Sequence, residues 1–275
     1  MHFVMSVNDN PDFLSFVKPV LNYYKAINID LTILILSEDE KIRANYSDKN
    51  VKFFNPVQNI DSGIQSKMLR HYYPCALDSS EVFVVTDIDQ FILSFKLITD
   101  NIKDLRNIVG FGKNIFNNTE LDGKTPMAPY ITNSGLSRQL FNIKKDINFE
   151  KFLENLQNFE LKIDGRESVK NQFNDFSDES LFRLLKKLNN IEFKNIDLDK
   201  DCDGERSIDR TPFHNIKNPN IGKFFWNRIY LNKKHKQDIL DNTYFDLLPP
   251  RPNRKYLVNK ILNIALEANS DRAVE

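Results

Sequence analysis

A short apolar run that ends in two aspartates constrains the fold of this chain more than any other stretch. Residues Val82–Val85 (VFVV) are mostly β-branched and have the length of one strand buried in a parallel sheet. Thr86 follows, and then Asp87 and Asp89 stand on either side of a single residue. We therefore expect a buried strand with both carboxylates directly after its carboxyl end.

Two carboxylates at the end of a strand can converge on one ligand. In open α/β sheets ligands bind outside the carboxyl ends of the strands, and hard divalent cations prefer carboxylate oxygens. Asp87 and Asp89 are therefore a candidate site for a metal ion and a phosphate. The alternative is a plain polar turn, since acidic residues commonly follow strands for that reason alone.

Strand and helix patterns alternate along the first part of the chain. This alternation is typical of βαβ units, so we expect an α/β fold with a mostly parallel central sheet flanked by helices. The apolar patterns predict strands at 2–8, 31–36, 51–54, 82–85, 108–112 and 191–193, and helices at 63–77, 149–159, 177–188 and 256–266.

The domain organisation follows from length and from the absence of breaks in the sequence. A chain of 275 residues can bury one large core, and no repeat or linker divides it. We predict a single domain over 1–275, in which 199–275 is a basic loop followed by a C-terminal helical extension.

The charge of the chain excludes some partners and leaves others open. Thirty-eight basic residues balance 38 acidic ones, which argues against nucleic acid as a partner. Arg210 to Lys260, however, holds eleven Lys or Arg against three Asp, an excess of eight positive charges. Such a segment can face phosphates or make peripheral contact with an anionic membrane, although a solvated basic face is the commoner explanation.

The location is inferred from the two cysteines and from hydropathy. Cys75 and Cys202 have no metal-type spacing and form no disulfide framework. No apolar run approaches the about 18 residues of a membrane span. We therefore expect a cytoplasmic protein, with the basic segment as its only candidate for membrane contact.

At this point the motifs resemble those of a known family. The early βαβ half, the helix with SKMLRHYYP, the strand VVTDIDQFIL, the Asn-Ser-Gly segment and a later helix that opens with Asp-Glu are similar to nucleotide-sugar glycosyltransferases of the GT-A fold, in particular bacterial and viral sugar transferases. The resemblance covers about residues 1–255 in element order. It implies a GT-A-type, Rossmann-like fold and a role in polysaccharide biosynthesis.

The resemblance implies a donor site for a nucleotide sugar, with a uridine nucleotide favoured. Mn²⁺ or Mg²⁺ on Asp87 and Asp89 would offset the charge that develops on the leaving diphosphate. The other implied donor residues are Ser6, Asn8, Lys67, Arg70, Ile88 and Arg251. A plain turn explains Ser6 and Asn8 equally well, and an exposed basic face explains Lys67 and Arg70.

The resemblance also implies an acceptor side, where a glycan or lipid-linked hydroxyl would bind. Asn133, Ser134 and Gly135 match the family's segment beneath the acceptor and the donor sugar, although an ordinary Asn-Ser-Gly turn is a strong alternative. Asp178 and Glu179 match the position of a general base in inverting members. Their other explanation is that acidic residues in a first helical turn favour the helix dipole.

The family pattern departs near the C-terminus. Related sequences often carry an Asp-x-His before Arg-Pro, whereas here YFDLLPPRP supplies Asp246 with Leu248 in place of histidine. His214 is a second candidate ligand, although a lone histidine is more often structural. The third metal ligand is therefore left open between Asp246 and His214.

Two other function classes compete with a glycosyltransferase. A haloacid-dehalogenase-like phosphohydrolase also places Asp-x-Asp after an apolar strand, but it normally has a small hydroxyl residue where this chain has Phe91. The remaining class is a GT-A-like domain that binds nucleotide or glycan without turnover. Nucleotide release from a panel of nucleotide sugars separates these classes.

Overall fold

The computed structural model describes residues 1–77, 80–103, 105–112, 129–157, 191–197, 206–208, 233–241, 244–247 and 254–270, together with Leu185 and Asn189. The chain forms two compact units from interleaved segments. The first unit comprises Met1–Asn10, Leu31–Asp87 and Asp104–Ile196. The second comprises Pro11–Asp30, Ile88–Lys103 and Asp197–Glu275.

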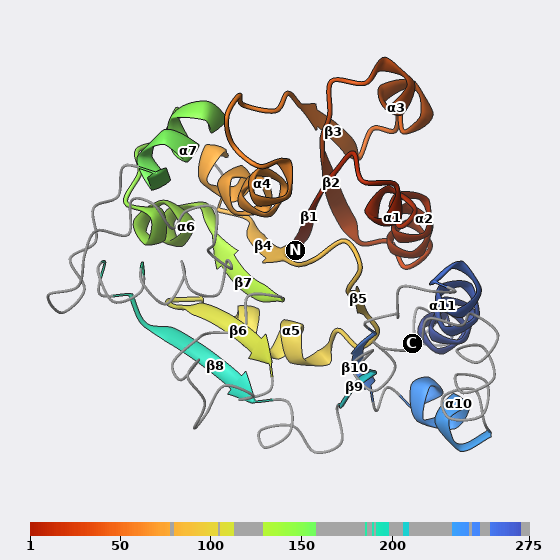
Figure 1. The fold of residues 1–275 in the computed structure, drawn as a ribbon. Helices are drawn as coiled ribbons and strands as arrows, with labels where there is room; N and C mark the ends of the chain where they lie inside the picture. The colour runs from red at the N-terminus through yellow and green to blue at the C-terminus, as the bar shows by residue number, and fades with distance from the viewer. Residues whose placement is uncertain are drawn as a thin grey trace, which may run out of the picture. The chain divides into compact units, whose positions relative to one another are not determined.

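The first unit is built on a seven-stranded sheet in the order β3-β2-β1-β4-β7-β6-β8 (Figure 1). Its β2 and β3 pair in parallel, as do β1 and β4, whereas β7 runs antiparallel to β4 and β6. The strands are β1 (His2–Asn8), β2 (Asp30–Leu36), β3 (Val51–Phe54), β4 (Val82–Val85), β6 (Ile108–Gly112), β7 (Tyr130–Asn133) and β8 (Phe193–Asp197).

The inner strands form because their residues are apolar on both faces. Phe3 to Val7 of β1 are buried without interruption, and so are the last six residues of β2. Continuous burial is the pattern of parallel strands covered on both sides, in contrast to the alternation of a half-exposed strand. The fold prediction made from these runs, a mostly parallel α/β sheet, is confirmed.

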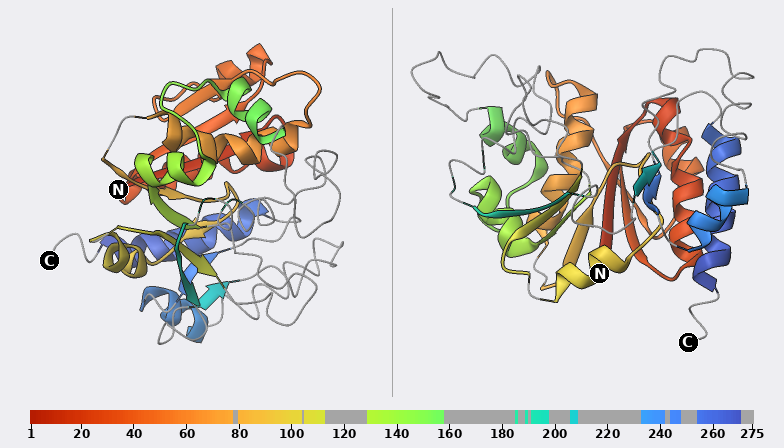
Figure 2. Two further views of the ribbon diagram at one scale, coloured as in Figure 1. Left: turned by 90° about the vertical axis from the view of Figure 1, so that its left-hand side faces the viewer. Right: turned by 90° about the horizontal axis from the view of Figure 1, so that it is seen from below.

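One face of this sheet is covered by α4 (Ser62–Ala76), α6 (Ser134–Phe141) and α7 (Phe149–Gln157) (Figure 2). Helix α4 packs against β1 and contacts both other helices. Its N-cap is Asp61, whose carboxylate accepts a hydrogen bond from the Ile64 amide at 3.0 Å. The short α3 (Glu40–Asn45) connects β2 to β3 and begins at a second aspartate cap, Asp39.

The second unit combines a small sheet with several helices. Its three strands have the order β5-β10-β9, and the bounds are β5 (Phe91–Ile92), β10 (Tyr244–Leu247) and β9 (Arg206–Ile208). Its helices are α1 (Pro11–Leu14), α2 (Val17–Ala26), α5 (Lys96–Ile102), α10 (Lys233–Leu240) and α11 (Arg254–Ser270). Helix α2 contacts α11, and Tyr23 of α2 donates a hydrogen bond to the Ile92 carbonyl at 2.8 Å.

Some predicted elements differ from those observed. The strand expected at 191–193 is β8, shifted to Phe193–Asp197, and it is followed by two more strands. The segment 199–275, expected to be a basic loop with a C-terminal helical extension, also contains the strands β9 and β10. The predicted helix at 177–188 lies outside the described residues, apart from the helical position of Leu185. The single domain over 1–275 stays a prediction. No helix in the described part of the chain is both long and apolar enough to cross a membrane.

Candidate functional site

The carboxyl end of β4 delivers Asp87 to the edge of the sheet. The Thr86 amide still donates to the Val4 carbonyl at 3.1 Å, so the chain leaves the sheet only after that residue. The side chain of Asp87 is 43% exposed, which leaves it able to meet a ligand. The prediction of a strand that ends just before Asp87 is confirmed, since β4 ends at Val85.

Helix α4 holds the carboxylate of Asp87 through Arg70. The Arg70 guanidinium donates to Asp87 Oδ1, and its own side chain is only 3% exposed. A buried guanidinium with a carboxylate partner is strongly constrained, because burying its charge unpaired would be costly. The alternative of an exposed basic face is therefore wrong for Arg70. Lys67, one turn earlier, is exposed, so the two residues do not share one environment.

A buried histidine and a buried tyrosine lie close to this ion pair. His71 follows Arg70 in the chain, and Tyr130 pairs with Val85, two residues before Asp87. His71 is fully buried, its Nδ1 lies 2.9 Å from the Tyr130 hydroxyl, and the two rings stack at 5.6 Å between centroids. Burial first, and then the positive charge of Arg70, lower the pKa of His71 well below its usual value. Sequence reasoning missed this pair. The only available signal was the position of His71 directly after Arg70.

The end of β1 is fastened to the first turns of α4. Ser6 donates its hydroxyl proton to the Ser66 carbonyl, and Asn8 Nδ2 donates to Ser62 Oγ at 3.2 Å. Ser6 is buried and Asn8 is half-buried. In the first unit, Ser6 and Asn8 therefore lie at the carboxyl end of β1, and Asp87 follows the carboxyl end of β4. Helix α4 contacts both strand ends, through Ser62 and Ser66 at β1 and through Arg70 at Asp87.

The Asn133-Ser134-Gly135 segment lies at the other end of β4. Strand β7 is antiparallel to β4, and its register sets Asn133 opposite Val82 while Tyr130 lies opposite Val85. Asn133 caps α6, with its Oδ1 accepting from the Leu136 amide at 2.8 Å. The register thus does not bring this segment together with Asp87, and its acceptor role stays a prediction.

The segment after Asp87 belongs to the second unit. Ile88 and Asp89 are both buried there, with 3% and 5% of their surface exposed, and β5 follows directly. Strand β10 runs antiparallel to β5, with Asp246 opposite Ile92 and Leu247 opposite Phe91. The strand that carries the candidate third ligand is therefore the neighbour of the strand that follows Asp89.

Four predicted site residues lie outside the described residues: Asp178, Glu179, His214 and Arg251. Within the described residues, no group of three or more His, Cys, Asp or Glu side chains gathers as a ready metal shell. Asp87 nevertheless suits a hard cation. Arg70 engages its Oδ1 only, and the described residues supply no hydrogen bond to its Oδ2.

Comparison with known proteins supports the fold. No family model matches the chain, and no curated protein matches it. Among solved structures, the galactosyltransferase LgtC in complex with donor and acceptor sugar analogues aligns with a TM-score of 0.50 at 13% identity, covering 96% of this chain and 95% of that one. An active-site mutant of LgtC aligns at 0.51 with the same identity and coverage. GlyE of Streptococcus pneumoniae TIGR4 aligns at 0.47 and 10% identity, over 99% of this chain and 64% of that one. The two LgtC alignments show that the chain has a glycosyltransferase-like, GT-A-type fold.

Proposed function

We propose that this protein is a glycosyltransferase that moves a sugar from a nucleoside-diphosphate sugar to a hydroxyl of a glycan or lipid-linked acceptor. The observation that carries the proposal is Asp87. It stands after a central strand of a glycosyltransferase-like sheet, half exposed, and a buried arginine fixes its carboxylate. Ligands of open α/β sheets bind at this edge. A uridine nucleotide is the favoured donor, on the resemblance of the motifs alone.

Asp87 and Asp89 are the residues that would hold Mn²⁺ or Mg²⁺, with Asp246 or His214 as a third ligand. When bound, the ion would neutralise the negative charge that develops on the leaving diphosphate. Asp246 is favoured over His214, because β10 pairs with β5, which begins two residues after Asp89. The donor chemistry fits, since all three aspartates supply carboxylate oxygens.

The chain's own groups have separate tasks in this proposal. Arg70 orients Asp87 from inside the protein rather than contacting phosphate, because its side chain is buried. Lys67 is exposed on the same helix and, with Arg251, is the candidate for phosphate contact. Ser6, Asn8 and Ile88 would meet the nucleoside side of the donor.

The acceptor hydroxyl needs a base if the enzyme inverts configuration. Asp178 is the proposed base and Glu179 the second choice, both on the resemblance of the sequence. The acceptor would reach them from the side of Asn133, Ser134 and Gly135. Full turnover in both Asp178→Asn and Glu179→Gln would place the base elsewhere or indicate a retaining mechanism.

The function is tested by incubating the protein with a panel of nucleotide sugars, with and without Mn²⁺, and following nucleotide release and transfer to added saccharides. We expect release from one class of donor, increased by Mn²⁺ and by an acceptor. Release of inorganic phosphate from phosphomonoesters would instead support a phosphohydrolase. Binding without any release would support a non-catalytic domain.

A further inference from the structure

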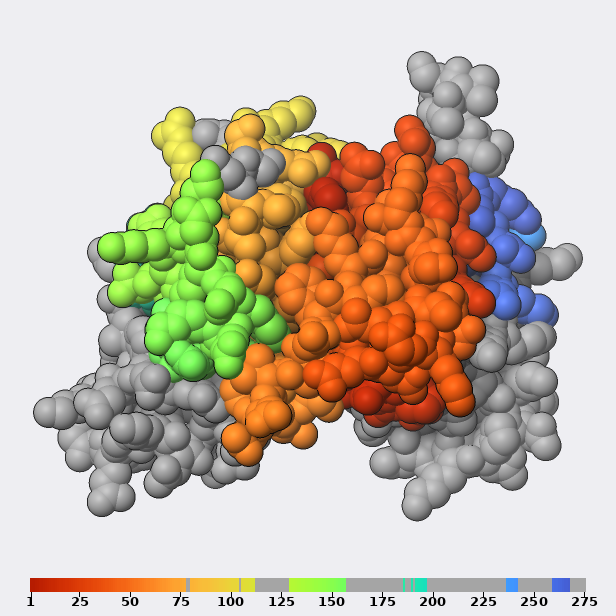
Figure 3. Space-filling view, turned by 90° about the horizontal axis from the view of Figure 1, so that it is seen from above, coloured from red at the N-terminus to blue at the C-terminus, as the bar shows by residue number. Residues whose placement is uncertain are grey.

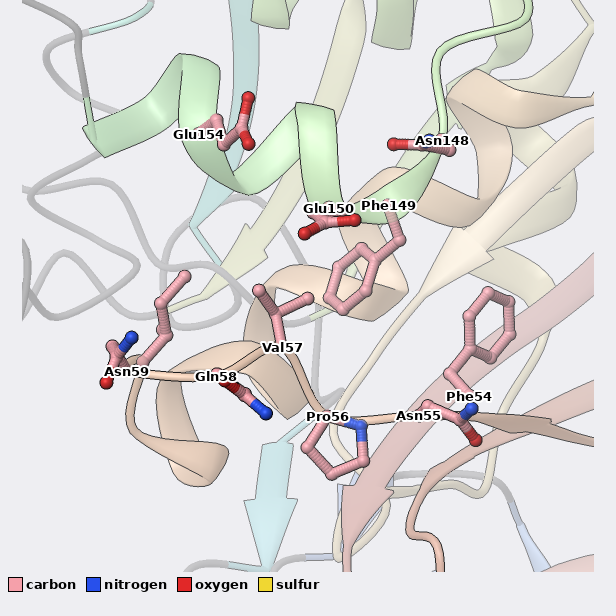
Figure 4. Close-up of a pocket in the computed structure, with 11 residues that line it drawn as sticks. Phe54, Asn55, Pro56, Val57, Gln58, Asn59, Asn148, Phe149, Glu150 and Glu154 are labelled. Atoms are coloured by element: carbon pink, nitrogen blue, oxygen red, sulfur yellow. The ribbon is translucent and has the colours of Figure 1, made fainter.

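The first unit contains a pocket that none of the predicted site residues lines. It has a volume of about 800 Å³ and lies between the β3–α4 loop and the start of α7. Figure 4 shows the loop on one side of the pocket and the helix with Glu150 and Glu154 on the other. In the space-filling view of Figure 3 the green surface of α7 lies beside the orange surface of the region that includes this loop. The volume is within the range of small-molecule sites.

The loop side of the pocket is held in shape by a buried side chain. Gln65 of α4 accepts from the Val57 amide and donates to the Val57 carbonyl, both at 2.8 Å, and it also donates to the Ile60 carbonyl at 2.8 Å. Gln65 is fully buried. Three bonds from one buried amide fix the loop before any ligand arrives, so binding would cost little ordering entropy.

The helix side is equally fixed. Asn148 accepts from the Lys151 amide at 2.8 Å and so caps the start of α7. Phe149 is anchored in the core, and its ring meets that of Phe54 edge-on at 6.0 Å. The two rings give the pocket an apolar, aromatic floor between two rigid walls.

The polar groups of the pocket are amides and carboxylates. Asn55, Gln58 and Asn59 are exposed on the loop, and Glu150 is exposed on the helix. Within the described lining there is no lysine or arginine, and the nearby Lys151 is paired with Glu154 at 2.7 Å. Such a lining disfavours phosphates and other anions. It suits hydroxyl groups, which donate to carboxylates and exchange hydrogen bonds with amides, while the C–H faces of a sugar ring pack on aromatic rings.

We propose that this pocket is a carbohydrate subsite that binds an uncharged sugar unit of a glycan, remote from the transferred sugar. It lies by the amino end of α4, since Ile60 lines it and Ser62 of the same helix start accepts the hydrogen bond from Asn8. The pocket and the predicted donor residue Asn8 are therefore both adjacent to the amino end of α4. The assignment of this glycan as the acceptor rests on the proposed function, whereas carbohydrate binding by the pocket is independent of that function.

The test is binding without nucleotide. Cellotetraose, maltotetraose and tetra-N-acetylchitotetraose are titrated against the full chain and followed by saturation-transfer-difference NMR. We expect at least one to bind, and Glu150→Ala to weaken it about tenfold, because a hydrogen bond to a charged group is lost. Asn59→Gly is the second variant. It keeps the left-handed backbone of Asn59 (φ 64°) and removes only the amide, so the loop retains its shape.

The matched control is Glu40→Ala, which also removes an acidic side chain from a first helical turn but lies on α3. It should leave saccharide binding unchanged. Absence of binding by all three saccharides, or equal binding by both pocket variants and the control, would overturn the subsite. Saccharide binding that disappears in the variants, in a protein that releases no nucleotide, would uphold the subsite and refute the transferase. Sugar transfer by a protein that binds none of the three saccharides would support the transferase and refute the subsite.

Discussion

At the scale of single residues, the candidate site depends on an ion pair in which the arginine is buried and the aspartate is half exposed. Arg70 has almost no exposed surface, and Asp87 is its partner. Solvent reaches the aspartate and weakens the attraction, but the guanidinium has no solvent to replace a lost partner. The pair therefore contributes more to the orientation of Asp87 than to overall stability.

A double-mutant cycle measures this coupling. Arg70→Met, Asp87→Asn and the double variant should give a coupling free energy of about 1–2 kcal/mol in urea unfolding, because each single change leaves the other group without its charge partner. Strictly additive losses would show that the two side chains do not depend on one another.

His71 gives a second prediction at this scale, which concerns pH. Its pKa is lowered on folding, so the unfolded chain binds the proton more readily, and stability falls as pH drops below the usual histidine pKa of about 6.5. Because of this one group, the free energy of unfolding should be lower at pH 5 than at pH 7.

The variant His71→Gln should flatten that pH dependence, and His2→Gln serves as the control. Urea unfolding at both pH values provides the measurement. A pH slope identical in the wild type and in His71→Gln would mean that another group titrates.

At the scale of elements, the strands and helices with strong local patterns were predictable. Strands β1, β2 and β4 are mostly apolar runs, and α4 follows an aspartate N-cap, and both patterns can be read from neighbouring residues. Pairing between distant segments was not predictable, because register depends on contacts far apart in the sequence. The resemblance implies an acceptor role for Asn133 but not its place in the sheet, where antiparallel pairing sets it opposite Val82.

The same limit applies to the candidate site. Asp87 was found from its position after a strand, which is local information. The burial of Arg70 and the stacking of His71 on Tyr130 depend on how α4 and β7 pack, and no spacing in the sequence specifies them. The pairing of β10 with β5 is likewise not specified by any local pattern, although the resemblance implies Asp246 as a candidate ligand.

A prediction at this scale concerns the loop between β3 and α4. Gln65→Leu removes all three hydrogen bonds that hold the loop and should cost about 2–3 kcal/mol in urea unfolding, because buried partners are left unsatisfied. Amide hydrogen exchange at Val57 should become faster. The control Gln58→Leu lies on the exposed side of the same loop and should change stability by no more than about 0.5 kcal/mol. Equal effects of the two variants would show that Gln65 does not anchor the loop.

At the scale of the whole molecule, the chain passes back and forth between two units, and one passage falls inside the Asp-x-Asp motif. Asp87 ends a segment of the first unit, and Ile88 begins a segment of the second. The fold is glycosyltransferase-like, at 13% identity to the two LgtC structures that it resembles. The central claim is that this motif binds a nucleotide with the help of a divalent ion.

Calorimetric titration of UDP, with Mn²⁺ and with a chelator, tests that claim most directly. We expect Mn²⁺ to strengthen binding at least about tenfold, which is about 1.4 kcal/mol. Asp89→Asn should abolish this gain while circular dichroism shows an unchanged fold. Asp30→Asn, an exposed aspartate at the start of β2, should retain the full gain. The same UDP affinity with and without Mn²⁺, or a metal-dependent gain that survives in Asp89→Asn, would contradict the account.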